Sequence, residues 1–276
     1  METSKPELHP EHQAFVDRFV AACKQNTDIV AAFLGGSYAR GTADRYSDID
    51  VYVIVSDDAF DDFNTNRDEF LRLLGEPLFI ENFDIPNFVF FIYADGVEGE
   101  LGIGSESKYT DIHAGPHIIL VDKKNILAGF EFAPAEPDPI EQAEQLRRLI
   151  YWFWHDLSHF ITAMQRGQFW WAQGQLEALR RYCVNLLRMR HNFTDLEAGD
   201  EPYFKIDKTM PVGQLSVLEE TFCRREKAAM LKSGVILVKI YKELATSLAR
   251  AHDIPYPEVL ERIMVQRLED LQESTG

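Results

Sequence analysis

The sequence has few cysteines and no long hydrophobic run. Its three cysteines, Cys23, Cys183 and Cys223, lie far apart with no metal-ligand spacing, and an odd number cannot all pair within the chain. They argue against a disulfide framework and indicate buried thiols in a reducing cytoplasm. No stretch approaches the roughly 18 consecutive apolar residues that a membrane-spanning helix needs, and Met1–Lys5 does not begin a signal peptide. We therefore expect a cytoplasmic protein with no membrane partner.

Basic residues are also scarce, with 28 Lys and Arg against 45 Asp and Glu and a formal net charge of −17. The excess of acidic residues is distributed unevenly along the chain. Residues 1–138 carry 26 acidic and 10 basic side chains, a balance of −16, whereas residues 139–276 carry 19 and 18, a balance of −1. Nucleic-acid binding depends on Lys and Arg contacts to phosphates, so we expect no nucleic-acid partner. An acidic half suits divalent cations and a cationic small molecule.

The 276 residues, 46% of them hydrophobic and 26% charged, are typical of a soluble globular protein of two domains. Three prolines in the segment 134–139 indicate a stiff linker, after which strand signals vanish. The predicted class is α/β, with a mixed sheet flanked by helices over residues 1–134 and an all-α helical bundle over 135–276. Before the linker, hydrophobic periodicity predicts helices over 11–25 and 58–74, and strands over 29–34, 51–55, 87–94, 97–103 and 117–121. After it, the pattern predicts helices over 140–165, 168–191, 215–249 and 256–272.

The residues that carry chemistry follow the first two strands. Gly35, Gly36 and Ser37 form a turn after the apolar segment 29–34, and Asp48 and Asp50 open the next apolar segment. Residues i and i+2 of a strand point to the same face, which places the two carboxylates about 6–7 Å apart. Carboxylate oxygens at that separation can share one or two Mg²⁺ ions, and a Gly-Gly-Ser turn can lay N–H groups and a hydroxyl against phosphate. This combination indicates phosphoryl or nucleotidyl transfer.

The stretch Gly35–Thr42, followed by Asp48-Ile49-Asp50, resembles the signature of the nucleotidyltransferase superfamily that includes DNA polymerase beta and the antibiotic nucleotidyltransferases. The resemblance implies that Asp48 and Asp50 bridge two Mg²⁺ ions on the triphosphate of ATP. It also implies that the turn holds the β- and γ-phosphates through the residues Gly35, Gly36 and Ser37. Arg40 lies close enough in sequence to touch the same phosphates, although a solvated arginine after the turn is an equal alternative.

The superfamily plan also needs a third acidic ligand on a neighbouring strand. The segment after the predicted Asp95-Gly96 hairpin turn offers Glu98 and Glu100, which share one face. We predict Glu100, because it lies deeper in the strand and is followed by an apolar residue, with Glu98 as the alternative. Glu100 would bind the metal nearer the acceptor and take the proton of its hydroxyl.

The second half resembles the C-terminal helical domains of the lincosamide and aminoglycoside nucleotidyltransferases, mainly over residues 166–180 and 254–257. In some relatives a glutamate of this domain is the general base, and Glu177 is the matching candidate. His155 and His159 have a helical spacing that can hold zinc, but no third ligand is in register. Four tryptophans could stack on a base or sugar, with core packing expected for most: Trp152, Trp154, Trp170 and Trp171. Three lysines are candidates to reach the triphosphate: Lys227, Lys232 and Lys239.

Together these features predict an enzyme that moves AMP from ATP onto a hydroxyl of a small, cationic acceptor and releases pyrophosphate. The resemblance points to an aminoglycoside- or lincosamide-like antibiotic as acceptor and allows a homodimer. One alternative is a non-catalytic protein of the same fold that binds a partner protein, as toxin–antitoxin pairs do. Addition to nucleic-acid ends fits the motif but conflicts with the charge of the N-terminal half.

Overall fold

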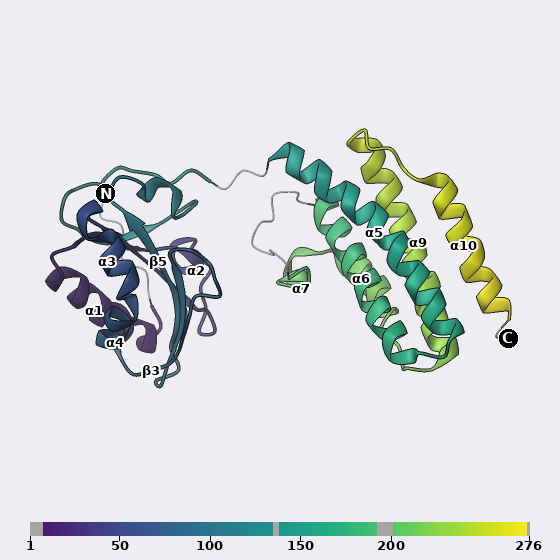
Figure 1. Cartoon of the computed structure of the whole chain (residues 1–276), viewed down its shortest axis with the longest axis horizontal. Coiled ribbons are helices and arrows are strands. Elements are labelled where there is room, and N and C mark those ends of the chain that lie inside the picture. The colour runs from purple at the N-terminus through teal and green to yellow at the C-terminus, as the bar shows by residue number, and fades with distance from the viewer. Residues whose placement is uncertain (1–7, 135–137, 192–200, 275–276) are drawn as a thin grey trace. The chain divides into compact units, whose positions relative to one another are not determined.

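The computed structural model describes residues 8–134, 138–191 and 201–274. The chain divides into two compact units, Met1–Ala135 and Glu136–Gly276. The first is a mixed β-sheet with flanking helices, and the second is helical (Figure 1). The predicted fold class is therefore confirmed. Among the described helices, none combines the length and apolar character needed to cross a membrane.

The six strands of the first unit form one sheet in the order β3-β4-β5-β2-β1-β6. Within it β2 and β5 run parallel, and each other pair of neighbours is antiparallel. The parallel register places Asp50 of β2 opposite Glu100 of β5. The strand bounds are β1 Ile29–Leu34, β2 Ile49–Val55, β3 Pro77–Glu81, β4 Phe88–Tyr93, β5 Glu98–Ser105 and β6 Ile118–Asp122.

The two faces of this sheet are covered differently. Residues Val51, Val53 and Val55 of β2 belong to a buried cluster with side chains from three helices, α1 Pro10–Gln25, α3 Phe60–Thr65 and α4 Arg67–Leu74. The alternate residues Tyr52 and Ile54 belong to a second, smaller cluster on the other face. Because side chains alternate along a strand, Asp50 also projects to this second face, away from the three helices.

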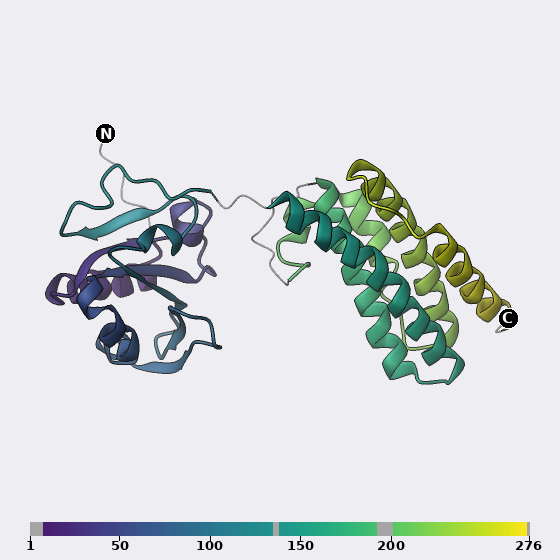
Figure 2. The same ribbon diagram turned by 45° about the horizontal axis from the view of Figure 1, so that its top comes forward.

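The second unit is built on four long helices, α5 Pro139–Gln165, α6 Phe169–His191, α9 Lys227–Ala251 and α10 Glu258–Glu273, with α5 lying beside α6 and α9 (Figure 2). The rings of Phe153 and Tyr241 stack with centroids 3.5 Å apart, and the Tyr241 hydroxyl donates to the Ile150 carbonyl at 2.8 Å. These contacts join α5 to α9 within a continuous apolar core. Its described residues also include the short helices α7 Ile206–Thr209 and α8 Val212–Glu219.

Two predicted helices need correction, and one strand was missed. The helix expected over 58–74 is interrupted at Asn66, whose side-chain amide donates to the Asp62 carbonyl at 3.1 Å and so competes with the helical hydrogen bonds. The helix expected over 215–249 is divided into α8 and α9, because Arg180 and Ser233 both donate to the Thr221 carbonyl. Strand β3 was not predicted: it is an edge strand whose mostly exposed residues show no alternation, and edges tolerate Pro77.

Candidate active site

Three carboxylates predicted as ligands come together at the start of β2 and β5. Asp50 lies in β2, Glu100 lies opposite it in β5, and Asp48 immediately precedes β2. Each of the three offers an oxygen within 4.8 Å of the others. Glu98 is exposed at the start of β5, pairs across from Ile92 of β4, and is not part of this group. We call Asp48, Asp50 and Glu100 the acidic triad.

Burial and mutual repulsion both act on the acidic triad. Burial, and then the charge of Asp48, raise the pKa of Asp50 to about 6, against the opposing effect of the Arg40 guanidinium and the Ser37 N–H. Burial, followed by the charges of Asp50 and Asp48, raises the pKa of Glu100 to about 7. Like charges held this close disfavour ionisation, and a bound cation would reverse that preference. The donor set of three carboxylates fits Mg²⁺, which prefers hard oxygen ligands.

The glycine turn packs directly against the acidic triad. The Gly35 N–H donates to the Asp50 carbonyl at 3.0 Å, and Gly36 has a φ of +57°. A β-carbon at Gly36 would lie 1.5 Å from Asp50 Oδ2, and one at Gly35 would lie 2.7 Å from the Tyr52 ring. Glycine at these positions therefore allows the carboxylate and the turn to share one small volume.

Ser37 has a polar atom with no partner. Its Oγ is buried and forms no hydrogen bond within the described part of the chain, while its N–H bonds to the Asp50 carboxylate. A buried hydroxyl without a partner is costly, so native structures usually satisfy such a group with another group, a water or a ligand. A phosphate oxygen beside the turn would accept a hydrogen bond from Ser37 Oγ. This residue set fits a metal-bound triphosphate.

Sequence reasoning missed several residues that shape this site. Tyr52 lies on the same sheet face as Asp50, and burial, with the charge of Asp50, raises its pKa, which keeps the phenol a neutral donor. His113 packs against Tyr52 with ring centroids 4.9 Å apart. The His12 ring of α1 hydrogen-bonds the hydroxyl of Tyr38, which lies in the short helix α2 Gly36–Ala39. Strand alternation from Asp50 would have found Tyr52, but no local pattern marks His12 or His113.

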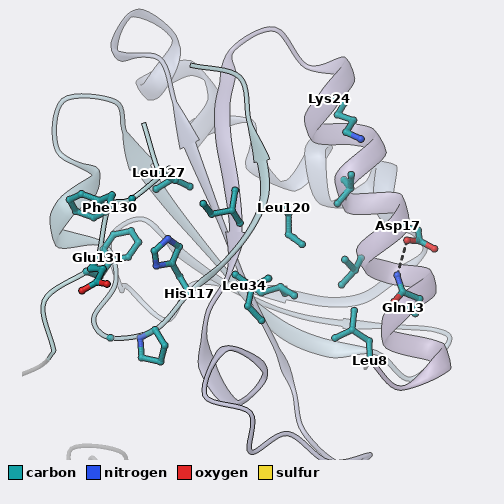
Figure 3. Close-up of a pocket in the computed structure, with 18 residues that line it drawn as sticks. Leu8, Gln13, Asp17, Lys24, Leu34, His117, Leu120, Leu127, Phe130 and Glu131 are labelled. Carbon is teal, nitrogen blue, oxygen red and sulfur yellow. Dashed lines mark hydrogen bonds between the residues drawn. The ribbon is translucent and has the colours of Figure 1, made fainter. Parts of the chain in front are cut away.

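A separate pocket extends along the edge strand β6. Figure 3 shows it between α1, which contributes Gln13 and Asp17, and a loop that carries Phe130 and Glu131. Leu34, the residue before the glycine turn, also lines it, but no residue of the acidic triad does. The pocket is therefore a neighbour of the glycine turn and not the location of the carboxylates.

The predicted residues of the helical unit have different surroundings. Both carboxylate oxygens of Glu177 are engaged: one pairs with the Arg180 guanidinium, and the other accepts from the Tyr203 hydroxyl at 2.8 Å. The expectation that most tryptophans pack in the core is wrong. Trp154 is 1% exposed, whereas the other three are 37–79% exposed: Trp152, Trp170 and Trp171.

The structure also shows where the predicted histidine pair and the candidate lysines lie. His155 and His159 of α5 lie with Asp156, and each of the three offers a donor atom within 4.8 Å of the others. The prediction that no third ligand is in register is therefore wrong, because the residue next to His155 reaches the pair. The three candidate lysines all lie on α9: Lys227, Lys232 and Lys239.

Comparison with known proteins decides the family. A model of the streptomycin adenylyltransferase family matches residues 10–271, almost the whole chain. The chain belongs to the streptomycin adenylyltransferase family. This confirms the predicted likeness to antibiotic nucleotidyltransferases.

Two further proteins resemble this streptomycin adenylyltransferase family member. A Methanocaldococcus jannaschii protein named as a protein adenylyltransferase is 50% identical over 42 residues, which are 14% of this chain and 29% of that protein. The match thus spans less than a third of the curated relative. The crystal structure of an aminoglycoside 6-adenyltransferase from Bacillus subtilis covers 96% of this chain and 99% of its own, with 14% identity and a TM-score of 0.46. The family assignment does not depend on either match.

Proposed function

We propose that the protein transfers AMP from ATP to a hydroxyl of an aminoglycoside and releases pyrophosphate, with Mg²⁺ held by the acidic triad. The observation that carries this proposal is the convergence of Asp48, Asp50 and Glu100 within 4.8 Å beside the glycine turn. Family membership adds the acceptor class, because the family is named for transfer to streptomycin.

The residues of the site have separate tasks. Asp48 and Asp50 would hold the metal, which when bound neutralises triphosphate charge and stabilises the charge that develops at the α-phosphorus. Gly36 has no β-carbon, so the Asp50 carboxylate can pack directly against the turn. Ser37 Oγ donates to a phosphate oxygen and so gains the partner that it lacks. Arg40 acts electrostatically on the Asp50 carboxylate and adds positive charge beside the phosphates.

Glu100 is our candidate for the general base. It would bind the metal nearer the acceptor and take the proton of the acceptor hydroxyl. Glu177 is the alternative from the sequence. Its two oxygens already accept from Arg180 and Tyr203, which hold this carboxylate within the helical unit.

Charge supports a cationic acceptor. Residues 1–138 carry a balance of −16, which attracts the ammonium groups of an aminoglycoside and repels the phosphates of a nucleic acid. A lincosamide would gain less from this charge. Cytoplasmic location and a homodimer remain predictions for this protein.

The test is a transfer assay with ATP, Mg²⁺ and a panel of aminoglycosides, including streptomycin, beside a lincosamide. Pyrophosphate release and the mass increase of the acceptor are measured for the wild type and for Asp48→Asn, Asp50→Asn and Glu100→Gln. We expect transfer to an aminoglycoside by the wild type and loss of at least roughly 100-fold in each variant. Glu98→Gln is the matched control, because Glu98 lies outside the acidic triad, and it should keep its activity.

Other outcomes would redirect the proposal. Full activity in Asp50→Asn would refute the metal assignment. Mg²⁺-dependent ATP binding without turnover on any small acceptor would overturn the acceptor and favour the partner-binding alternative. AMP attached to a protein would point instead to a protein hydroxyl, the acceptor that the name of the archaeal relative suggests.

A further inference from the structure

We propose that the helical unit carries a second metal site, formed by His155, Asp156 and His159 of α5, which takes a zinc-like divalent cation. These residues belong to a different unit from the acidic triad, and the proposal does not depend on the transfer reaction. Two imidazoles and one carboxylate within one turn of a helix form a donor set that differs in kind from three carboxylates.

The positions of the donor atoms suit a small cation. His155 Nδ1 lies 2.9 Å from Asp156 Oδ1, and no pair among the three donor atoms is more than 4.8 Å apart. A tetrahedral Zn²⁺ with nitrogen and oxygen ligands at roughly 2.0–2.1 Å places its donor atoms ~3.3 Å from one another. His155 and Asp156 are therefore already near the required separation. Rotation of the His159 side chain would close the remaining distance, because His155 and His159 lie one turn apart with ring centroids separated by 4.3 Å.

The neighbouring helix supports two of the three ligands. The Tyr182 hydroxyl of α6 donates to Asp156 Oδ2 at 2.8 Å, and only 14% of the Asp156 side chain is exposed. The Trp171 ring, also of α6, packs against the His159 ring with centroids 5.6 Å apart. A hydrogen bond to a ligating carboxylate fixes its orientation, which is how metal sites are usually supported by the residues around their ligands. The Tyr182 bond leaves Asp156 Oδ1 directed at His155.

The donor types predict which metals bind. Imidazole nitrogen suits Zn²⁺, Co²⁺ and Ni²⁺, whereas Mg²⁺ prefers oxygen ligands and retains its waters. The two sites of this protein should therefore differ in selectivity, with Mg²⁺ at the acidic triad and a transition metal at His155 and His159. Three protein ligands also leave one coordination position for water or for a donor atom of a bound molecule.

The experiment uses the whole chain, stripped of metal with a chelator and kept in excess Mg²⁺ so that oxygen-only sites are filled. Zn²⁺ is titrated by calorimetry, and Co²⁺ is followed through its visible absorption bands. We expect the wild type to bind one equivalent of Zn²⁺ that is lost in His155→Ala and in His159→Ala. Tyr182→Phe should weaken this binding by roughly 10-fold or more, because it removes only the support of Asp156.

His191→Ala is the matched control, since His191 is an exposed histidine at the end of α6 outside the group. It should bind Zn²⁺ like the wild type. Thermal unfolding shows which variants fold, and Zn²⁺ should raise the melting temperature of the wild type but not of His159→Ala. The proposal would be overturned if the wild type did not bind Zn²⁺, or if folded His155→Ala and His159→Ala bound Zn²⁺ as tightly as the wild type does. The His155–Asp156 contact would then be an ordinary hydrogen bond.

Discussion

Replacing Asp50 with asparagine should make the metal-free protein more stable above neutral pH while it removes transfer activity. Burial and the charge of Asp48 raise the pKa of Asp50 from 3.8 to about 6. Below 3.8 the carboxyl is protonated in both the folded and the unfolded chain. As the pH rises towards 6, the unfolded chain ionises first, so the free energy of unfolding falls across this window. The asparagine side chain of the variant does not titrate, so the free energy of unfolding of the variant does not fall for this reason.

The size of the change in the free energy of unfolding follows from the two pKa values of Asp50, 3.8 in the unfolded chain and about 6 in the folded chain. A difference of roughly two pKa units corresponds to about 3 kcal/mol, at 1.36 kcal/mol for each unit. Asp50 is only half-buried, so solvent screening lowers this contribution, and we expect about 1–2 kcal/mol. This value is the amount by which the difference in free energy of unfolding between Asp50→Asn and the wild type changes as the pH rises. It is therefore separate from any loss of packing that the substitution causes at every pH.

The assay is urea unfolding in the presence of EDTA at about pH 4 and about pH 8, which lie on either side of most of the window. Asp58→Asn, an exposed aspartate next to α3, is the control and should show no such change. Added Mg²⁺ should stabilise the wild type at the higher pH and leave Asp50→Asn unaffected. Equal destabilisation of Asp50→Asn at both pH values would refute the reasoning that burial and repulsion raise this pKa.

Three further predictions concern the turn and the helical unit. Gly36→Ala should lower pyrophosphate release by about 100-fold in a folded protein, because its β-carbon would lie 1.5 Å from Asp50 Oδ2 and displace the carboxylate. Arg180→Met should lower the free energy of unfolding in urea by about 1–3 kcal/mol, since Arg180 is buried and the substitution removes the hydrogen bonds that its guanidinium donates to Thr221 and Glu177. Glu177→Gln should keep kcat within a few-fold of the wild type, and a folded variant with a loss of about 100-fold would transfer the general-base role from Glu100 to Glu177.

The sequence predicted the local structure around the carboxylates well, because strand alternation and turn chemistry are local properties. The segment 29–34 forms β1 as expected, and Asp50 projects to the sheet face opposite Val51. Gly36 adopts the positive φ that a Gly-Gly turn favours. What the sequence could not supply is the reason for that glycine, since the contact with Asp50 depends on how the turn folds back on β2.

Contacts between distant segments account for the errors. They also explain why Glu98 stayed an alternative to the predicted Glu100, because the pairing of β5 with β2 depends on a register that no local pattern specifies. The break between α8 and α9 depends on side chains from α6 and α9 that bond to Thr221. Asp156 was overlooked as a partner of the histidines because the spacing argument considered only residues that share a helix stripe.

The most direct test of the central claim is the crystal structure of the protein with Mn²⁺ and a non-hydrolysable ATP analogue. Anomalous scattering would locate the metal without reference to the protein coordinates. Our account predicts Mn²⁺ bound by oxygens of Asp48, Asp50 and Glu100 at about 2.1–2.3 Å, with the phosphates against Gly35, Gly36 and Ser37. Metal and phosphates bound elsewhere, with these three carboxylates making no contact to them, would contradict it.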